Sequence, residues 1–224
     1  MWGHYRKSAT AFTGLVIEVI QGDAVTGSAV QTSKVSAPGH IVIVRHGEPD
    51  ANRYERMGWR GYERWWAAYD EAGLRAGQTP PSELLEQAAQ AQTRFASTLP
   101  RAIETAKACI GTEDLIIDSQ FVEAPLPPPK LPGRFQARTW GVFARCSWWM
   151  GHARGRETRK QSEHRAANVA STLIEASQQG PVILFAHGWF NRMIRPRLQQ
   201  HGWECVRDGG DWYWSWRRYE LKNR

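Results

Sequence analysis

Two runs of large apolar residues, each ending near a histidine, constrain the fold of this chain most strongly. Residues 41–44 (IVIV) and 182–185 (VILF) contain no polar residue. A strand with one face in water alternates apolar and polar side chains, so these unbroken runs indicate strands buried on both faces, as in parallel sheets. A histidine follows each run after one further residue, at His46 and at His187. We therefore expect a parallel sheet with two histidines at strand ends.

Helical spacing, prolines and glycines indicate the other elements. The expected helices cover residues 61–73, 82–94, 100–109 and 157–177, with another after Gly188, and the further strands cover residues 94–97, 115–117 and 211–221. The last strand alternates in polarity and is expected to close the sheet as an edge strand. Ser82 is the expected N-cap of the second helix. Strands that alternate with helices indicate an α/β fold, a three-layer α/β/α sandwich with a mainly parallel sheet.

The first 40 residues differ in composition from the rest of the chain. We expect a poorly defined N-terminal extension over residues 1–40 and one domain over residues 41–224. The fairly apolar stretch over residues 9–20 is interrupted by Glu18, and no convincing cleavage site follows, so no secretion signal is expected. No apolar run approaches the ~20 residues of a membrane span, so no membrane partner is expected.

Cysteine usage and charge limit the compartment and the partners. Cys109, Cys146 and Cys205 are widely spaced and form no pair suited to zinc or to a disulfide framework, which favours the reducing cytoplasm. The formal net charge is +7, and most of the basic residues are arginines. Such a charge suits nucleic acid, a membrane surface or a small anionic substrate, and the planar guanidinium group matches two phosphate oxygens at once.

Three strand ends bring together the residue types of an anion site. In an open α/β sheet, ligands bind outside the carboxyl ends of the strands. Arg45 and His46 follow the first strand, and His187 follows the second apolar run. The strand over residues 94–97 leads to Arg101, in the first turn of a helix, where unpaired N–H groups favour anions. Two arginines and two histidines at one sheet edge indicate a phosphate site.

Several blocks resemble the histidine phosphatase superfamily, also called phosphoglycerate-mutase-like, in its branch 1. Residues 45–48 (RHGE) resemble the signature of that family, and Asn52 lies where its members commonly have a phosphate-binding asparagine. Residues 97–106 (STLPRAIETA) are similar to its second block, and residues 182–188 (VILFAHG) are similar to its last block. The resemblance covers about residues 41–200, in the right order and spacing.

The resemblance implies a phosphatase that works through a covalent intermediate. His46 would attack phosphorus and become a phosphohistidine, which water then cleaves. Four residues would hold the transferred group and neutralise its charge: Arg45, Asn52, Arg101 and His187. Because arginines would supply this charge, neither a metal ion nor another cofactor is expected. The substrate would be a phosphorylated small molecule or a phosphoprotein.

The departing oxygen needs a proton, and the resemblance places the acid at Glu123, after the middle strand. The glycine- and tryptophan-rich continuation that is usual in the family is missing, and a proline-rich loop over residues 125–132 replaces it. A loop glutamate that faces solvent is the alternative interpretation of Glu123. Glu48 is the second candidate for the acid, or a residue that orients other groups.

Departures from the family pattern narrow the range of activities that the resemblance implies. Pro49 stands where Thr or Ser is common, and Gly188 stands where acid phosphatases have Asp. The chain also lacks the Glu-Arg-His-Tyr-Gly stretch of glycolytic mutases and the P-loop of bifunctional sugar kinase–phosphatases. The arginine- and tryptophan-rich segment over residues 134–165 is either a cap over the pocket or an ordinary helical excursion with tryptophans in its core, and the second interpretation is slightly favoured.

Two other functions stay open on the sequence alone. A catalytically inactive, phosphatase-like binding protein would recognise a phosphorylated partner, although it would not need all four of the arginines and histidines at the strand ends. Binding of nucleic acid through the arginine-rich segment is the least favoured alternative. Turnover of an aryl phosphate separates the first two functions, and salt-dependent binding of DNA tests the third.

Overall fold

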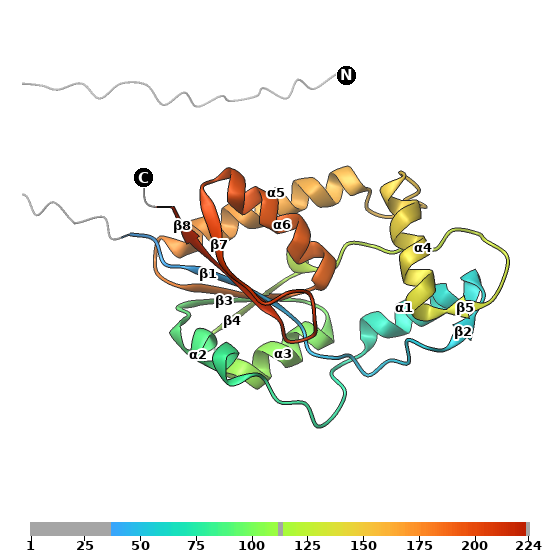
Figure 1. Ribbon diagram of the computed structural model, residues 1–224, viewed down its shortest axis with the longest axis horizontal. Coiled ribbons are helices and arrows are strands. Elements are labelled where there is room, and N and C mark those ends of the chain that lie inside the picture. The colour runs from blue at the N-terminus through green and yellow to red at the C-terminus, as the bar shows by residue number, and fades with distance from the viewer. Residues whose placement is uncertain (1–36, 112–113, 223–224) are drawn as a thin grey trace, which may run out of the picture. The chain divides into compact units, whose positions relative to one another are not determined.

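A six-stranded mixed sheet forms the centre of the structure (Figure 1). The computed structural model describes residues 37–111 and 114–222, so nearly all of the expected N-terminal extension lies outside the described residues. The strands of the sheet are β1 (Ile41–Arg45), β3 (Thr93–Ser97), β4 (Leu115–Asp118), β6 (Val182–Ala186), β7 (Trp203–Asp208) and β8 (Trp216–Leu221). Their order is β4-β3-β6-β1-β8-β7. The first four are parallel to one another, and β8 is antiparallel to both β1 and β7.

Helices cover both faces of this sheet and complete the three layers expected from the sequence (Figure 1). The helices α2 (Ser82–Gln90) and α3 (Pro100–Ile110) pack on one face, and α5 (Arg159–Ser177) and α6 (Gly188–Gln200) pack on the other. A short 3₁₀ helix, η1 (Ser119–Phe121), follows β4.

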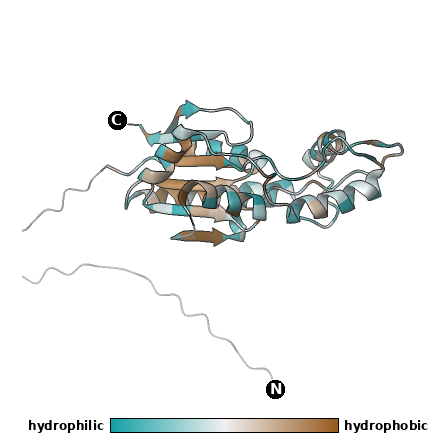
Figure 2. Ribbon diagram, turned by 90° about the horizontal axis from the view of Figure 1, so that it is seen from below, coloured by the Kyte–Doolittle hydropathy of each residue, from teal (hydrophilic) through white to brown (hydrophobic). Residues whose placement is uncertain are grey.

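The apolar run of β1 is explained by burial on both faces. Ile41 and Ile43 join the core under α5 and α6, whereas Val42 and Val44 join the core under α2 and α3. All four side chains are at most 3% exposed. Figure 2 shows the same distribution, with the most hydrophobic segments in the strands between the helical layers.

A smaller unit lies beyond the carboxyl ends of the parallel strands (Figure 1). It contains the helices α1 (Trp59–Glu71) and α4 (Ala137–Trp149) and a two-stranded sheet of β2 (Arg56–Met57) and β5 (Phe135–Gln136). Tyr62 of α1 and Trp140 of α4 are fully buried in a core of its own. The Trp140 Nε1–H donates to the carbonyl oxygen of Met57 at 2.7 Å, which joins α4 to β2.

Several element boundaries differ from the sequence predictions. The helix expected over residues 61–73 begins at Trp59, and the helix expected over residues 82–94 ends at Gln90. The prediction that Ser82 is the N-cap is wrong: Pro81 holds that position, and Ser82 is already helical. Prolines fix φ near the helical value, so a helix readily starts beside them without a side-chain cap.

The prediction of a closing edge strand over residues 211–221 is wrong in two respects. The strand β8 begins only at Trp216, and it lies between β1 and β7. The edge strand is β7, which the sequence analysis missed. Trp214 has a φ of 63°, in the left-handed region that interrupts an extended strand, so residues 209–215 form a loop instead.

Neither a membrane-spanning helix nor a metal-binding cluster occurs in the described residues. None of the helices in these residues is long and apolar enough to cross a membrane. Within the same ranges, no three His, Cys, Asp or Glu side chains gather in a group that could hold a metal ion.

Candidate active site

His46 lies directly after β1, at the carboxyl end of the sheet, and is 3% exposed. Its Nδ1 is 2.7 Å from the carbonyl oxygen of Gly47. Because a carbonyl oxygen only accepts hydrogen bonds, Nδ1 must carry a proton and donate it. In the neutral ring, Nε2 then keeps the free lone pair that a nucleophile needs.

His187 lies across from His46, because their strands are neighbours. β1 and β6 pair in parallel with Arg45 opposite Ala186, and the two histidines are the next residues along each strand. The centroids of their rings are 5.1 Å apart. The Nε2 of His187 is 2.8 Å from the Oγ of Ser97, the last residue of β3. Three strand ends therefore meet, as the sequence pattern indicated.

Arg101 is fully buried in the first turn of α3, and α1 holds its side chain. Its Nη1 donates to the carbonyl oxygen of Tyr69 at 2.8 Å, and its Nη2 donates to Oδ1 of Asp70 at 3.1 Å. The hydroxyl of Thr105 donates to the Arg101 carbonyl oxygen at 2.6 Å and accepts from the Gly47 N–H at 2.9 Å. Arg101 is thereby fixed both to the smaller unit and to the end of β1.

Arg45 and the loop between β7 and β8 cover His46. Arg45 donates from Nη1 to the carbonyl oxygen of Asp211, and its Cζ lies 4.5 Å from the centroid of the Tyr213 ring. The Tyr213 ring is 5.8 Å from the His46 ring, and its hydroxyl accepts from Nη1 of Arg53 at 3.0 Å. The sequence analysis missed both Tyr213 and Arg53. The only local signal for Tyr213 was its aromatic run, which was assigned to a strand.

Three buried nitrogen atoms near His46 have no hydrogen-bond partner among the described residues. They are Nε of Arg45, Nε of Arg101 and Nδ1 of His187. Buried polar atoms in folded proteins are seldom left unpaired, so this arrangement needs an explanation. An anion with several oxygens would pair with these nitrogens, and two guanidinium groups would balance its charge. The site is chemically suited to phosphate.

Burial and neighbouring arginines keep both histidines neutral. Burial is the largest cause that lowers the pKa of His46 well below its usual 6.5, and Arg101 and Arg45 lower it further. The hydrogen bond to Gly47 acts in the opposite direction. Burial also lowers the pKa of His187 well below 6.5, followed by Arg101, His46 and Arg45. Both rings are therefore unprotonated at neutral pH, and an unprotonated imidazole is the form that can act as a nucleophile.

We expect the free energy of unfolding to decrease as the pH falls below about 6.5, the usual pKa of histidine. The unfolded state takes up protons on both histidines in that range, whereas the folded state does so only at a much lower pH. Stability should therefore decrease on acidification by up to about 1.4 kcal/mol per pH unit for each histidine. Urea denaturation between pH 7.5 and pH 5.0, in buffers without phosphate, measures this slope. The double variant His46→Gln/His187→Gln should lose most of it, and a wild-type stability that is flat over this range would contradict the prediction.

Glu123 holds the start of α6, the helix that follows His187. Its Oε1 accepts from the N–H groups of Phe190 at 2.8 Å and Ala124 at 2.9 Å, and its Oε2 accepts from the N–H of Trp189 at 3.0 Å. N–H groups in the first helical turn lack partners within the helix, and a negative charge is favourable there. The carboxylate is thus directed to the segment that carries His187.

Asp70, the partner of Arg101, is a further carboxyl group that the sequence analysis missed. Burial is the largest cause that raises its pKa, while Arg101 lowers it and the charge of Glu123 raises it. Glu123 is therefore close enough to Asp70 for its charge to affect the pKa of Asp70. No local pattern marks Asp70, because its importance depends on α1 packing beside α3.

Glu48 and Asn52 are more exposed than His46, Arg101 and His187. Glu48 forms an ion pair with Arg75 at 2.8 Å, and both side chains are partly exposed. The Oδ1 of Asn52 accepts from the N–H of Tyr54 at 3.0 Å, within its own turn. The amide of Asn52 is thus engaged locally, and its phosphate-binding role stays a prediction.

The arginine- and tryptophan-rich segment contributes both to a core and to the surroundings of Glu123. Trp140 and Trp148 are fully buried, as the core interpretation predicted. Arg145 lies between two aromatic rings, with its Cζ 4.5 Å from the centroid of Trp189 and 5.1 Å from that of Trp148. Burial lowers the pKa of Arg145 to about 10, and the charge of Glu123 opposes this effect.

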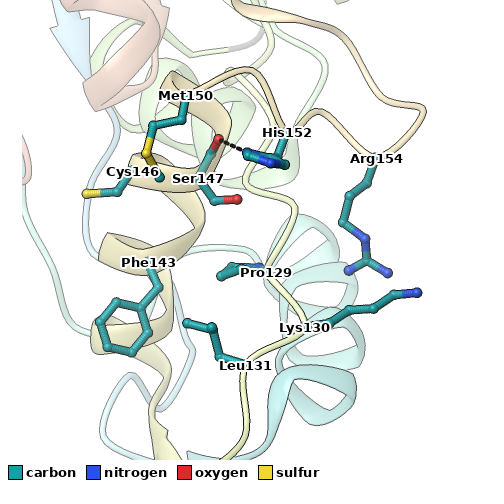
Figure 3. A pocket seen from close by; sticks show the side chains of 9 residues that line it. All are labelled: Pro129, Lys130, Leu131, Phe143, Cys146, Ser147, Met150, His152 and Arg154. Carbon is teal, nitrogen blue, oxygen red and sulfur yellow. Dashed lines mark hydrogen bonds between the residues drawn. The ribbon is translucent and has the colours of Figure 1, made fainter.

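A cavity of about 770 Å³ lies between α4 and the proline-rich loop (Figure 3). Apolar side chains such as Phe143, Met150 and Leu131 dominate its walls. None of the arginines and histidines at the strand ends lines it. Lys130, His152 and Arg154 also line it, but they lie apart from the residues that meet at the three strand ends, so its size does not make it the active site.

Comparison with protein-family models shows which family this chain belongs to. The model of the histidine phosphatase superfamily (branch 1) matches residues 41–211, a range that includes the three strand ends. The protein belongs to this superfamily, as the resemblance of its sequence blocks implied. Membership supports a phosphatase activity. No protein of curated function matches the sequence significantly.

Solved structures of low sequence identity share the fold. The mycobacterial glucosyl-3-phosphoglycerate phosphatase in complex with VO3 has a TM-score of 0.52 at 21% identity, over 80% of this chain and 92% of that chain. The mycobacterial hydrolase 1 has a TM-score of 0.51 at 18% identity, over 80% of this chain and 88% of that chain. At these identities the likeness concerns the fold, and it agrees with the α/β/α architecture.

Proposed function

We propose that the protein is a phosphomonoesterase in which His46 forms a phosphohistidine intermediate. The observation that carries this proposal is the state of the His46 ring, which is buried and neutral, with Nδ1 donating to Gly47 and Nε2 free. Unpaired nitrogen atoms of Arg45, Arg101 and His187 near this ring support phosphate as the ligand. Membership of the superfamily supports the same activity.

The proposed reaction has two displacements at phosphorus. In the first, Nε2 of His46 forms a bond to phosphorus while the bond from phosphorus to the leaving oxygen breaks. An acid, for which we propose Glu123 with Glu48 as the second candidate, gives a proton to that oxygen. In the second, water attacks phosphorus, the bond to Nε2 breaks, and a water proton returns to the acid. The products are an alcohol and inorganic phosphate.

The charges of the site are suited to stabilise both transition states. Arg45 and Arg101 are cations that are held in place before substrate arrives, and fixed charges of this kind need little reorganisation during the reaction. His187 is neutral and offers a hydrogen bond without adding another positive charge. Asn52 is proposed to reach the phosphate once substrate is bound.

We expect p-nitrophenyl phosphate to be hydrolysed at the same rate with and without EDTA, because the arginines supply the positive charge that a metal ion provides in other phosphatases. Steady-state assays on protein treated with chelator measure this. Activity that is lost with EDTA and restored by Mg²⁺ would contradict the metal-independent reaction. Tight binding of inorganic phosphate without any turnover would favour the alternative, a phosphatase-like protein that only binds a phosphorylated partner.

The compartment and the substrate class are also part of the proposal. Cys109, Cys146 and Cys205 are all free thiols, which supports a cytoplasmic location. The substrate is a phosphorylated small molecule or a phosphoprotein.

A further inference from the structure

A second cavity, of about 290 Å³, shares the residue Tyr213 with the surroundings of the proposed nucleophile. Tyr213 forms part of its wall, and the same ring lies 5.8 Å from the His46 ring. Glu48, two residues beyond His46, lines it as well. Tyr213 therefore borders both the cavity and the His46 ring, which places the cavity beside a substrate held at His46.

The walls of this cavity are strongly basic. Arg53, Arg75 and Arg138 all line it, and Glu48 is the only carboxylate among its lining residues. Three guanidinium groups against one carboxylate leave two excess positive charges. A cleft lined by an excess of one charge attracts ions of the opposite sign, so this cavity attracts anions.

The partners of the three arginines show which of them are available to a ligand. Arg75 is neutralised by its ion pair with Glu48 at 2.8 Å. Arg53 donates to the Tyr213 hydroxyl at 3.0 Å, and Nε of Arg138 donates to Oε1 of Gln136 at 2.7 Å. Both of these acceptors are uncharged. Among the described residues, the charges of Arg53 and Arg138 thus have no anionic partner in the cavity.

We propose that this cavity binds a second anionic group of the substrate, a carboxylate or a second phosphate, through Arg53 and Arg138. The inference rests on the proposed function and specifies its substrate class: phosphomonoesters of small molecules that carry another acidic group. A volume of about 290 Å³ suits the remainder of a small metabolite. Bidentate pairing of a guanidinium group with either kind of anion would give both affinity and orientation.

Matched pairs of substrates test this proposal. Phosphoglycolate and its neutral carboxamide have nearly the same shape and differ in one negative charge. Propane-1,3-diol bisphosphate and the corresponding monophosphate form the second pair, and they distinguish a phosphate from a carboxylate as the second group. We expect the wild-type kcat/KM to favour the acidic member of at least one pair by roughly tenfold or more, as charge-assisted hydrogen bonds imply.

Variants of the cavity and a matched control complete the experiment. Arg138→Gln and Arg53→Gln should each reduce the preference for the acidic substrate severalfold, with Arg53→Gln also removing a bond to Tyr213. Arg197→Gln replaces an arginine of α6 that donates to Gln200 outside the cavity, and it should keep the wild-type preference. Equal kcat/KM within both wild-type pairs, or a preference that survives both cavity variants, would overturn the proposal.

Binding measurements separate a failure of the subsite from a failure of the proposed function. The same pairs are titrated calorimetrically onto the His46→Ala variant, which reports affinity without turnover. If the wild type hydrolyses p-nitrophenyl phosphate and neither pair is discriminated in rate or affinity, the phosphatase function stands and the subsite is wrong. If no ester is hydrolysed while the acidic ligands still bind more tightly through Arg138, the subsite stands and the phosphatase function is wrong.

Discussion

Replacement of His46 by alanine should abolish phosphatase activity, with a loss in kcat on the order of 10⁴-fold or more. Removing the nucleophile of a covalent mechanism costs up to about 10⁶-fold in a well-studied hydrolase. The expectation follows from the free Nε2 of the neutral His46 ring beside Arg45 and Arg101. Brief incubation of the wild type with ³²P-labelled substrate, followed by rapid quenching, should leave label on the protein that is labile in acid and stable in alkali.

The control for this experiment is His164→Ala, which removes an exposed histidine of α5. It should retain full activity and form the same labelled intermediate. The fold of His46→Ala is checked by circular dichroism and by its binding of inorganic phosphate. Near wild-type turnover by His46→Ala, or label that survives acid, would contradict the assignment of the nucleophile.

The second large effect is expected for Glu123→Gln, and its size should depend on the leaving group. A nitrophenolate leaves readily without a proton, whereas an alkoxide does not. General acid catalysis contributes ~10²–10⁴-fold where it is needed, so hydrolysis of alkyl phosphates should fall by that order while p-nitrophenyl phosphate is affected far less. Steady-state kinetics on both substrates, over a range of pH, measures the difference.

The hydrogen bonds of Glu123 make this comparison necessary. Both carboxylate oxygens accept from N–H groups at the start of α6, and the amide of glutamine has only one oxygen that accepts. Glu123→Gln therefore also loosens the helix that begins just after His187. If activity were lost because α6 is loosened, hydrolysis of both substrates would decrease equally. Glu123 would then be a positioning residue. In that case Glu48→Gln, made in parallel, is expected to show the dependence on the leaving group instead.

The three strand ends were predictable from the sequence because their signals are local. β1 and β6 have apolar side chains on both faces, and in the structure both faces of each strand are buried. Pro100 marks the helix that carries Arg101, since its fixed φ suits a first helical turn. Parallel strands that end at one sheet edge then bring His46 and His187 together without any knowledge of the loops.

Tyr213 and Arg53 were not predictable, because they approach His46 through long-range packing. Tyr213 reaches the site from a loop that follows the edge strand, and its position depends on the pairing of β7 with β8 and of β8 with β1. Strand pairing of this kind is determined by tertiary contacts rather than by the residues of one segment. The aromatic run around Tyr213 has the composition of a strand, so the local signal favoured the wrong assignment.

The hydrogen bonds between Arg101 and α1 have a consequence for how this protein can be diversified. The backbone carbonyl of Tyr69 and the half-buried carboxylate of Asp70 are the partners of a fully buried guanidinium group, and a buried charge that loses its partners is strongly destabilising. Replacement of α1 would therefore damage the proposed binding site of the transferred phosphoryl group. α4 carries Arg138, which lines the basic cavity, and among the described residues no hydrogen bond joins α4 to Arg101, so we expect variation of α4 to change the range of substrates with less damage to the proposed phosphate site.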